Sequence, residues 1–140
     1  MDSPPPAPSL PAQRLLGKTV LITGAGGTIG LETAKRMLQE GANLGLVDID
    51  GQALDRAMDK LRVLLVSRRE ETTGELRLLP LRADCTDEAA VEAYTVQTFL
   101  AFGRLDCVFL TVGMSGGSMS IFDATVEDYE KLMRINVKSG

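Results

Sequence analysis

The 140-residue chain contains no histidine and no tryptophan, and it has only two cysteines. Without histidine it cannot build a Ser-His-Asp or Cys-His catalytic set or a histidine-ligated metal site, so we expect no metal centre. Cys85 and Cys107 stand outside any paired motif, which is typical of reduced thiols in the cytoplasm. No apolar run approaches the roughly 18 residues of a membrane span. The first residues also lack the basic and apolar regions of a signal peptide.

Basic residues do not outnumber acidic ones either, with 15 lysines and arginines against 19 aspartates and glutamates. The net charge of −4 argues against nucleic acid or a membrane surface as a partner. Proline is nearly absent after residue 11, because five of the six prolines lie between Pro4 and Pro11. We therefore predict a disordered Pro-rich arm over residues 1–16, with a polyproline ligand as the alternative, and one folded domain over residues 17–140.

The folded part alternates between two hydrophobic periodicities. Short apolar runs rich in β-branched residues predict strands, and apolar repeats of three to four residues predict helices. This alternation predicts an α/β fold, an incomplete, doubly wound parallel sheet of the Rossmann type with strand order 3-2-1-4. Pro80 lacks a ladder N–H and is expected at a sheet edge or at an irregularity in the strand. The expected strands are Thr19–Thr23, Asn43–Asp48, Leu76–Ala83 and Leu105–Val112, and the expected helices are Ile29–Glu40, Asp50–Val66, Thr86–Phe102 and Thr125–Lys138. Thr86 and Thr125 are expected to cap the last two helices.

A glycine-rich turn, Thr23-Gly24-Ala25-Gly26-Gly27-Thr28-Ile29-Gly30, directly follows the first strand and opens the first helix. In that context glycines permit a tight turn, a close approach of backbone N–H groups to a pyrophosphate, and close packing of helix on strand. The N-terminus of the helix favours an anion. The alternative is a glycine-rich turn without a ligand. We assign to dinucleotide binding Gly24, Gly26, Gly27, Thr28, Ile29 and Gly30.

Three polar residues complete the candidate site. Asp48 ends the second strand and is expected to bind the adenosine ribose and to repel a 2′-phosphate, which favours NAD over NADP. Its alternative role, capping the next helix, suits Asp50 better, so we expect the Asp48 side chain to be free. Asp84 ends the third strand and is expected either to meet the adenine edge or to cap a helix. Asn136, in the last helix, is expected to be buried and therefore to need hydrogen-bond partners. It is either a site residue or an asparagine satisfied by neighbouring backbone.

Together these motifs resemble the short-chain dehydrogenase/reductase family. The resemblance covers roughly Gly17 to Gly140 and implies an oxidoreductase that binds a nicotinamide dinucleotide and moves hydride to or from an alcohol or carbonyl substrate. It also implies a cofactor contact at Gly113 and a catalytic position at Asn136. Besides the glycine turn, the matching landmarks are Val47-Asp48, Ala83-Asp84-Cys85-Thr86-Asp87, Phe102-Gly103-Arg104-Leu105-Asp106 and Met133-Arg134-Ile135-Asn136-Val137.

The chain departs from the family pattern at two motifs. Its turn reads Gly24-x-x-Gly27-x-x-Gly30, as in the family's extended branch, with Thr28 where the common pattern has glycine. The Thr28 hydroxyl can still donate to a phosphate. Leu110-Thr111-Val112-Gly113 stands where the family has Asn-Asn-Ala-Gly, and this divergence is compatible with a specialised enzyme of secondary metabolism.

The family's catalytic serine and Tyr-x-x-x-Lys have no match, since Tyr94 is followed by Thr98 and Tyr129 by Met133. Two hypotheses follow. The chain is the cofactor-binding front part of an NAD-dependent oxidoreductase acting on an unidentified alcohol or ketone. Alternatively, it is a catalytically inactive, truncated member that serves as a nucleotide-binding or interaction module. In either case its fourth strand is expected to be an open edge suited to self-association.

Overall fold

The computed structural model describes residues 13–68, 78–117 and 120–138. Four parallel strands form one sheet in the order β3-β2-β1-β4, which confirms the predicted fold class and strand order. None of the helices in the described ranges has the length and apolar character needed to cross a membrane. The elements are β1 (Thr19–Thr23), α1 (Thr28–Gln39), β2 (Asn43–Asp48), α2 (Gly51–Arg68), β3 (Leu78–Arg82), α3 (Glu88–Phe102), β4 (Cys107–Leu110) and α4 (Val126–Asn136).

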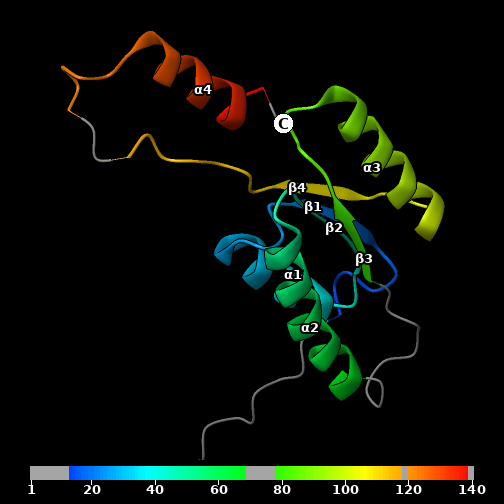
Figure 1. Ribbon diagram of the computed structural model, residues 1–140. Helices are drawn as coiled ribbons and strands as arrows, with labels where there is room; N and C mark the ends of the chain where they lie inside the picture. The colour runs from blue at the N-terminus through cyan, green and yellow to red at the C-terminus, as the bar shows by residue number, and fades with distance from the viewer. Residues whose placement is uncertain (1–12, 69–77, 118–119, 139–140) are drawn as a thin grey trace, which may run out of the picture.

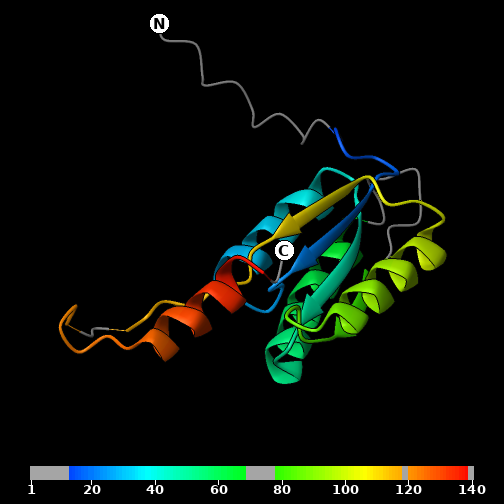
Figure 2. The same ribbon diagram turned by 90° about the horizontal axis from the view of Figure 1, so that it is seen from above.

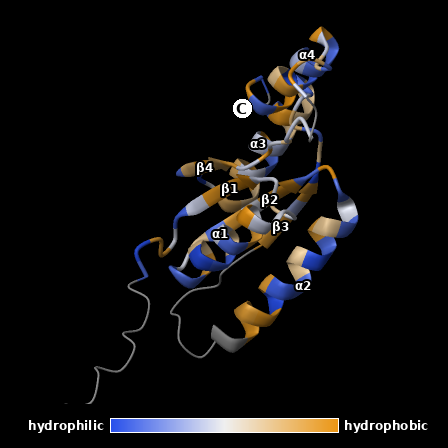
Figure 3. Ribbon diagram, turned by 90° about the vertical axis from the view of Figure 1, so that its left-hand side faces the viewer, coloured by the Kyte–Doolittle hydropathy of each residue, from blue (hydrophilic) through white to orange (hydrophobic). Residues whose placement is uncertain are grey.

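Helices cover both faces of the sheet: α1 and α2 lie on one face and α3 lies on the other (Figures 1 and 2). Successive side chains of a strand point to opposite faces, so Val20 and Ile22 pack with α1 and α2 while Leu21 packs on the side of α3. Every residue of β1 is buried. This two-sided burial explains why the central strands read as continuous apolar runs, visible between the helices in Figure 3.

Strand β3 lies at one edge of the sheet, as the position of Pro80 predicts. The start of the next helix differs from the expectation. Thr86 was expected to cap it, but the helix begins at Glu88 and the side chain of Asp87 accepts hydrogen bonds from the N–H groups of residues 89 and 90. Thr86 is instead held by Asp84, whose Oδ1 accepts from both its N–H and its hydroxyl at 2.8 Å.

Helix α4 stands apart from the sheet (Figures 1 and 2). Among the described elements it packs against no other helix or strand, and none of its residues is buried. A reciprocal pair of hydrogen bonds ties its end to the segment after β4: Asn136 Oδ1 accepts from Met114 N at 2.8 Å, and Asn136 Nδ2 donates to Met114 O at 3.0 Å. Thr125 caps the helix through a capping box with Asp128, as the sequence predicts.

The two cysteines lie at opposite edges of the sheet. Cys85 follows β3, Cys107 begins β4, and both are free. The strand order predicts this separation, because two other strands lie between them.

Most of the expected arm, residues 1–12, lies outside the described residues, and its last residues are attached to the domain. Leu15 N donates to the Glu40 carbonyl at 2.9 Å. The Glu40 side chain is only 3% exposed and accepts hydrogen bonds from the guanidinium groups of Arg14 at 2.9 Å and Arg36 at 2.7 Å. The hydrogen bonds from Arg14 are the largest influence that lowers the pKa of Glu40, to about 2.

Replacing Glu40 by glutamine should destabilise the folded chain at neutral pH. Because the pKa of Glu40 is lowered from 4.5 to about 2, the ionised carboxylate stabilises the fold fully above pH 4.5, and this contribution is lost as the pH falls through about 2. Urea unfolding of both proteins at stepped pH should show a gap in midpoint that closes on acidification. Glu32→Gln, which breaks an exposed pair with Lys35, should shift the midpoint little. A gap that widens in acid would contradict the assignment.

Candidate functional site

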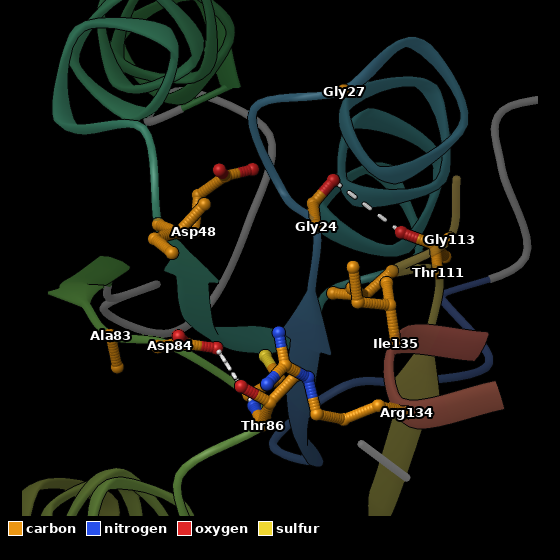
Figure 4. A pocket seen from close by; sticks show the side chains of 13 residues that line it. Gly24, Gly27, Asp48, Ala83, Asp84, Thr86, Thr111, Gly113, Arg134 and Ile135 are labelled. Atoms are coloured by element: carbon orange, nitrogen blue, oxygen red, sulfur yellow. Dashed lines mark hydrogen bonds between the residues drawn. The ribbon is translucent and has the colours of Figure 1, made fainter. Parts of the chain in front are cut away.

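A cavity of about 360 Å³ opens at the carboxyl ends of the strands, the edge where open α/β sheets bind ligands (Figure 4). Its walls come from the turn after β1, the end of β2, the segments after β3 and β4, and α4. Five of the residues predicted from the sequence line it: Gly24, Gly27, Asp48, Asp84 and Gly113. The other lining residues are Ile49, Ala83, Cys85, Thr86, Thr111, Val112, Arg134 and Ile135.

The floor of the cavity is the tight turn at Gly24. Its φ of +69° is a left-handed conformation, and a Cβ there would lie 2.8 Å from Thr111 Oγ1. Thr111 Oγ1 in turn donates a hydrogen bond to the Thr23 carbonyl at 2.6 Å. The turn after β1 is therefore closed against the end of β4, with no room for a side chain at residue 24.

The next two glycines serve the turn itself. Gly26 N donates to Asp48 Oδ2 at 2.8 Å, and Gly27 N donates to the Gly24 carbonyl at 3.1 Å. A Cβ at Gly26 would stand 2.7 Å from that of Ala53 in α2. Since these two N–H groups are used within the protein, the donors left for an anion come from the following residues of the turn.

Helix α1 begins without a side-chain cap, with Gly27 at its N-cap position. Side chains do cap the other three described helices, through Asp50, Asp87 and Thr125. Thr28 and Ile29 are exposed at the start of α1, and the first N–H groups of a helix have no partner within it. The uncapped, partially positive end of α1 therefore lies at the rim of the cavity that Gly27 lines.

Gly30 sets how closely α1 approaches β1. It is buried, and a Cβ built on it would lie 2.1 Å from the Gly24 carbonyl oxygen, far inside van der Waals contact. Only glycine allows this contact, as the sequence pattern predicts. The glycine lies behind the turn and does not line the cavity.

Asp48 is a half-buried carboxylate that organises the turns on both sides of it. Its Oδ2 accepts from Gly26 N at 2.8 Å and its Oδ1 accepts from Asp50 N at 2.9 Å. Asp50 caps α2, as expected, but Asp48 is not the free side chain that we predicted. Each of its oxygens keeps a second lone pair, so the carboxylate can still accept from a ligand.

Asp84 lies across the cavity from the glycine turn and is held by Thr86. The hydrogen bonds from the backbone and hydroxyl of Thr86 lower the pKa of Asp84, and the positive charge of Arg134 lowers it further. Asp84 is therefore ionised at neutral pH, and Arg134 is the cation that its charge faces.

The thiol of Cys85 forms part of the same wall. Burial raises the pKa of Cys85, and burial is also the largest influence that raises the pKa of its neighbour Tyr94 to about 12. Both groups are therefore protonated at neutral pH, and the cysteine contributes packing rather than a nucleophilic thiolate.

Asn136 does not line the cavity, and it is exposed rather than buried as expected. Its hydrogen bonds to Met114 fix the backbone that follows Gly113, whose Cβ position is 3.5 Å from Asn136 Oδ1. The Asn136 side chain is thus satisfied by backbone, which was one of the two alternatives. That backbone belongs to Met114, 22 residues away in the chain.

Sequence reasoning missed Thr111, Arg134 and Ile135 as residues of the cavity. Thr111 follows the fourth strand, and the rule that strand ends meet the ligand crevice was sufficient to find it. No comparable signal marked Arg134 and Ile135, because the direction in which a helix faces depends on the loop that precedes it.

Comparison with known proteins agrees with this geometry. The profile of the family described as short chain dehydrogenase matches residues 18–140. Levodione reductase of Leifsonia aquatica is 37% identical over 132 residues, which are 94% of this chain and 46% of that protein. The chain thus spans about half the length of the curated relatives that it matches.

Solved structures show the same likeness. The crystal structure of levodione reductase aligns with a TM-score of 0.77 and 32% identity, over 90% of this chain and 46% of that one. NAD⁺-bound xylitol dehydrogenase aligns with a TM-score of 0.79 and 30% identity, over 90% of this chain and 45% of that one. With a family profile that covers most of its residues, the chain belongs to the short-chain dehydrogenase family.

Proposed function

We propose that the chain binds a nicotinamide dinucleotide across the carboxyl ends of its strands and supplies the cofactor-binding half of an oxidoreductase. One observation carries the proposal: the uncapped end of α1 and the carboxylate of Asp48 border the same cavity. A helix N-terminus binds phosphate, and a carboxylate at the end of the second strand binds ribose hydroxyls. The family as a whole uses NAD or NADP, and the aligned xylitol dehydrogenase holds NAD⁺.

The cavity suggests an orientation for this ligand. The pyrophosphate would meet the glycine turn and the first N–H groups of α1, at Thr28 and Ile29, while Gly30 behind the turn keeps α1 close to β1. The adenosine ribose would hydrogen-bond to Asp48, and the adenine would lie toward Asp84. Gly113, after β4, would border the path toward the nicotinamide, with Asn136 keeping that segment in place through its bonds to Met114.

In the whole protein, we propose hydride transfer between the nicotinamide and an alcohol or ketone. The segment Leu110-Thr111-Val112 diverges from the family pattern, and this supports a specialised substrate of secondary metabolism. Cys85 and Cys107 are both free, in keeping with a reducing cytoplasmic setting.

Replacing Asp48 by alanine should narrow the preference of the chain for NADH over NADPH. The carboxylate repels a 2′-phosphate and accepts from a 2′-hydroxyl, so the unmodified chain should bind NADH at least about tenfold more tightly, a difference of about 1.4 kcal/mol. Isothermal titration calorimetry with both nucleotides measures this. Asp50→Ala, which removes the cap of α2 outside the cavity, should leave the ratio unchanged. Equal affinities in the unmodified chain would overturn the NAD assignment.

The 140-residue chain, purified as it stands, should bind nucleotide weakly, self-associate and show no dehydrogenase turnover. Of the catalytic residues that the family resemblance implies, only Asn136 has a match here. Strand β4 is hydrogen-bonded to β1 alone among the described strands, and its Val108 and Leu110 are about half exposed. Sedimentation velocity measures the self-association, and an NAD-linked assay with a panel of alcohols measures the turnover.

Two results would contradict this expectation. Dehydrogenase turnover by the 140-residue chain would show that its chemistry does not need the family's catalytic serine and Tyr-x-x-x-Lys motif. A monomer with a cooperative thermal transition would favour the alternative hypothesis, a small nucleotide-binding or interaction module.

A further inference from the structure

The structure assigns a further nucleotide contact to Arg134 of α4: its guanidinium lies over the adenine ring and joins α4 to the rest of the site. This inference rests on the proposed function and deepens it, because it adds a specific recognition element for the adenosine half of the ligand. Arg134 lies within the Met133–Val137 landmark, but that motif indicated only Asn136 as a site residue.

The geometry is the first support. Arg134 and Ile135 line the cavity, although α4 packs against none of the other described helices or strands. In Figure 4 the side chain of Arg134 extends from α4 toward Thr86 and Asp84. The wall that α4 supplies is held by the hydrogen bonds between Asn136 and Met114 and not by packing on another helix or strand of the described chain. A ligand in the cavity would lie between α4 and the strand ends.

Charge is the second support. The titratable residues that line the cavity are the carboxylates of Asp48 and Asp84, the thiol of Cys85 and the guanidinium of Arg134. Arg14, Arg36 and Arg104 each form an ion pair at 2.9 Å or less, whereas no carboxylate in the described part of the chain lies within 4.0 Å of the Arg134 guanidinium. Because no carboxylate among the described residues pairs with it, the planar face of Arg134 is available to a ligand.

The position of Arg134 in the cavity decides which part of the ligand its guanidinium meets. The pyrophosphate belongs at the N-terminus of α1 and the ribose at Asp48, so the base reaches the segment after β3, where Asp84 and Arg134 face each other. A guanidinium stacks on a π face, and Arg does so more readily than Lys because its charged group is planar. Adenine supplies that face, and the apolar residues Ile49 and Ala83 also line the cavity.

The test uses ADP-ribose and NADH with four forms of the 140-residue chain: unmodified, Arg134→Leu, Arg134→Lys and Lys131→Leu. Lys131 is an exposed cation on the same helix that does not line the cavity, so Lys131→Leu controls for loss of positive charge on α4. We expect Arg134→Leu to weaken both ligands about tenfold, Arg134→Lys to fall between, and Lys131→Leu to match the unmodified chain. Competition by 5′-AMP should show the same order.

A second readout separates contact from structure. Hydrogen exchange of the α4 amides should slow when ADP-ribose binds the unmodified chain, and this slowing should be much smaller in Arg134→Leu. Without ligand, the two proteins should exchange alike. No binding by the unmodified chain would overturn the proposed function and this inference together. Equal affinities and equal slowing in the unmodified chain and Arg134→Leu would overturn this inference alone.

Discussion

Gly24→Val is expected to abolish dinucleotide binding. Residue 24 adopts φ of +69°, where a β-branched side chain is strained, and its Cβ would lie 2.8 Å from Thr111 Oγ1 and 3.2 Å from the backbone of residues 111 and 112. The turn would have to open, and the end of β4 would have to move away from it. Because Gly24 lines the cavity, this displacement distorts the floor on which the pyrophosphate would rest.

Thr28→Ala is the matched comparison. It removes one hydroxyl at the exposed start of α1 and leaves the backbone N–H groups in place, so it should weaken NADH binding by only about 1 kcal/mol, the contribution of one neutral hydrogen bond. Calorimetry on both variants, with circular dichroism to verify folding, measures the difference. Equal losses of affinity would show that the Thr28 hydroxyl matters as much as the turn at Gly24, which would contradict the roles assigned to the two residues.

Gly30→Ala should be the most destabilising single substitution in the turn. The added methyl would sit 2.1 Å from the Gly24 carbonyl oxygen and 2.8 Å from its carbon, and both are backbone atoms that no rotamer change can move. Helix α1 would have to separate from β1, which loosens the central core. We expect a loss of about 3 kcal/mol or more in the free energy of unfolding, measured by urea titration.

Gly27→Ala provides the control three residues earlier. Residue 27 has φ of −75° and ψ of 166°, an ordinary extended conformation, and its Cβ would meet only the Gly24 carbonyl oxygen at 3.3 Å. Its stability should fall by less than about 1 kcal/mol. If the two substitutions destabilise the fold equally, close packing of α1 on β1 is not the reason for glycine at position 30.

The sequence was sufficient to predict the elements and their order, because the buried strands and amphipathic helices carry distinct periodicities. The edge position of β3 followed from Pro80, and the conformation of Gly24 followed from its place between strand and helix. Both features depend on local chemistry, because Pro80 lacks a backbone N–H and Gly24 lacks a Cβ.

The details that depend on packing were not predictable. Asp48 was expected to be free, yet the fold brings the N–H of Gly26 to it from 22 residues away. Asp87 rather than Thr86 caps α3, because Asp84 already holds Thr86. Arg134 reaches the cavity through the path of the loop that precedes α4. Each outcome depends on a competition between hydrogen-bond partners or on a loop direction that periodicity does not encode.

The two edges of the sheet are unequal, and this inequality limits how copies of the chain can combine. Pro80 removes an N–H from the middle of β3, whereas Cys107–Leu110 of β4 contains no proline. Proline cannot donate a ladder hydrogen bond, so β4 is the edge better suited to strand pairing between copies. Two copies that join β4 to β4 across a two-fold axis use both of these edges, and the pairing closes. We therefore expect strand pairing through β4 to end at a dimer, so that a higher concentration gives more pairs rather than longer assemblies.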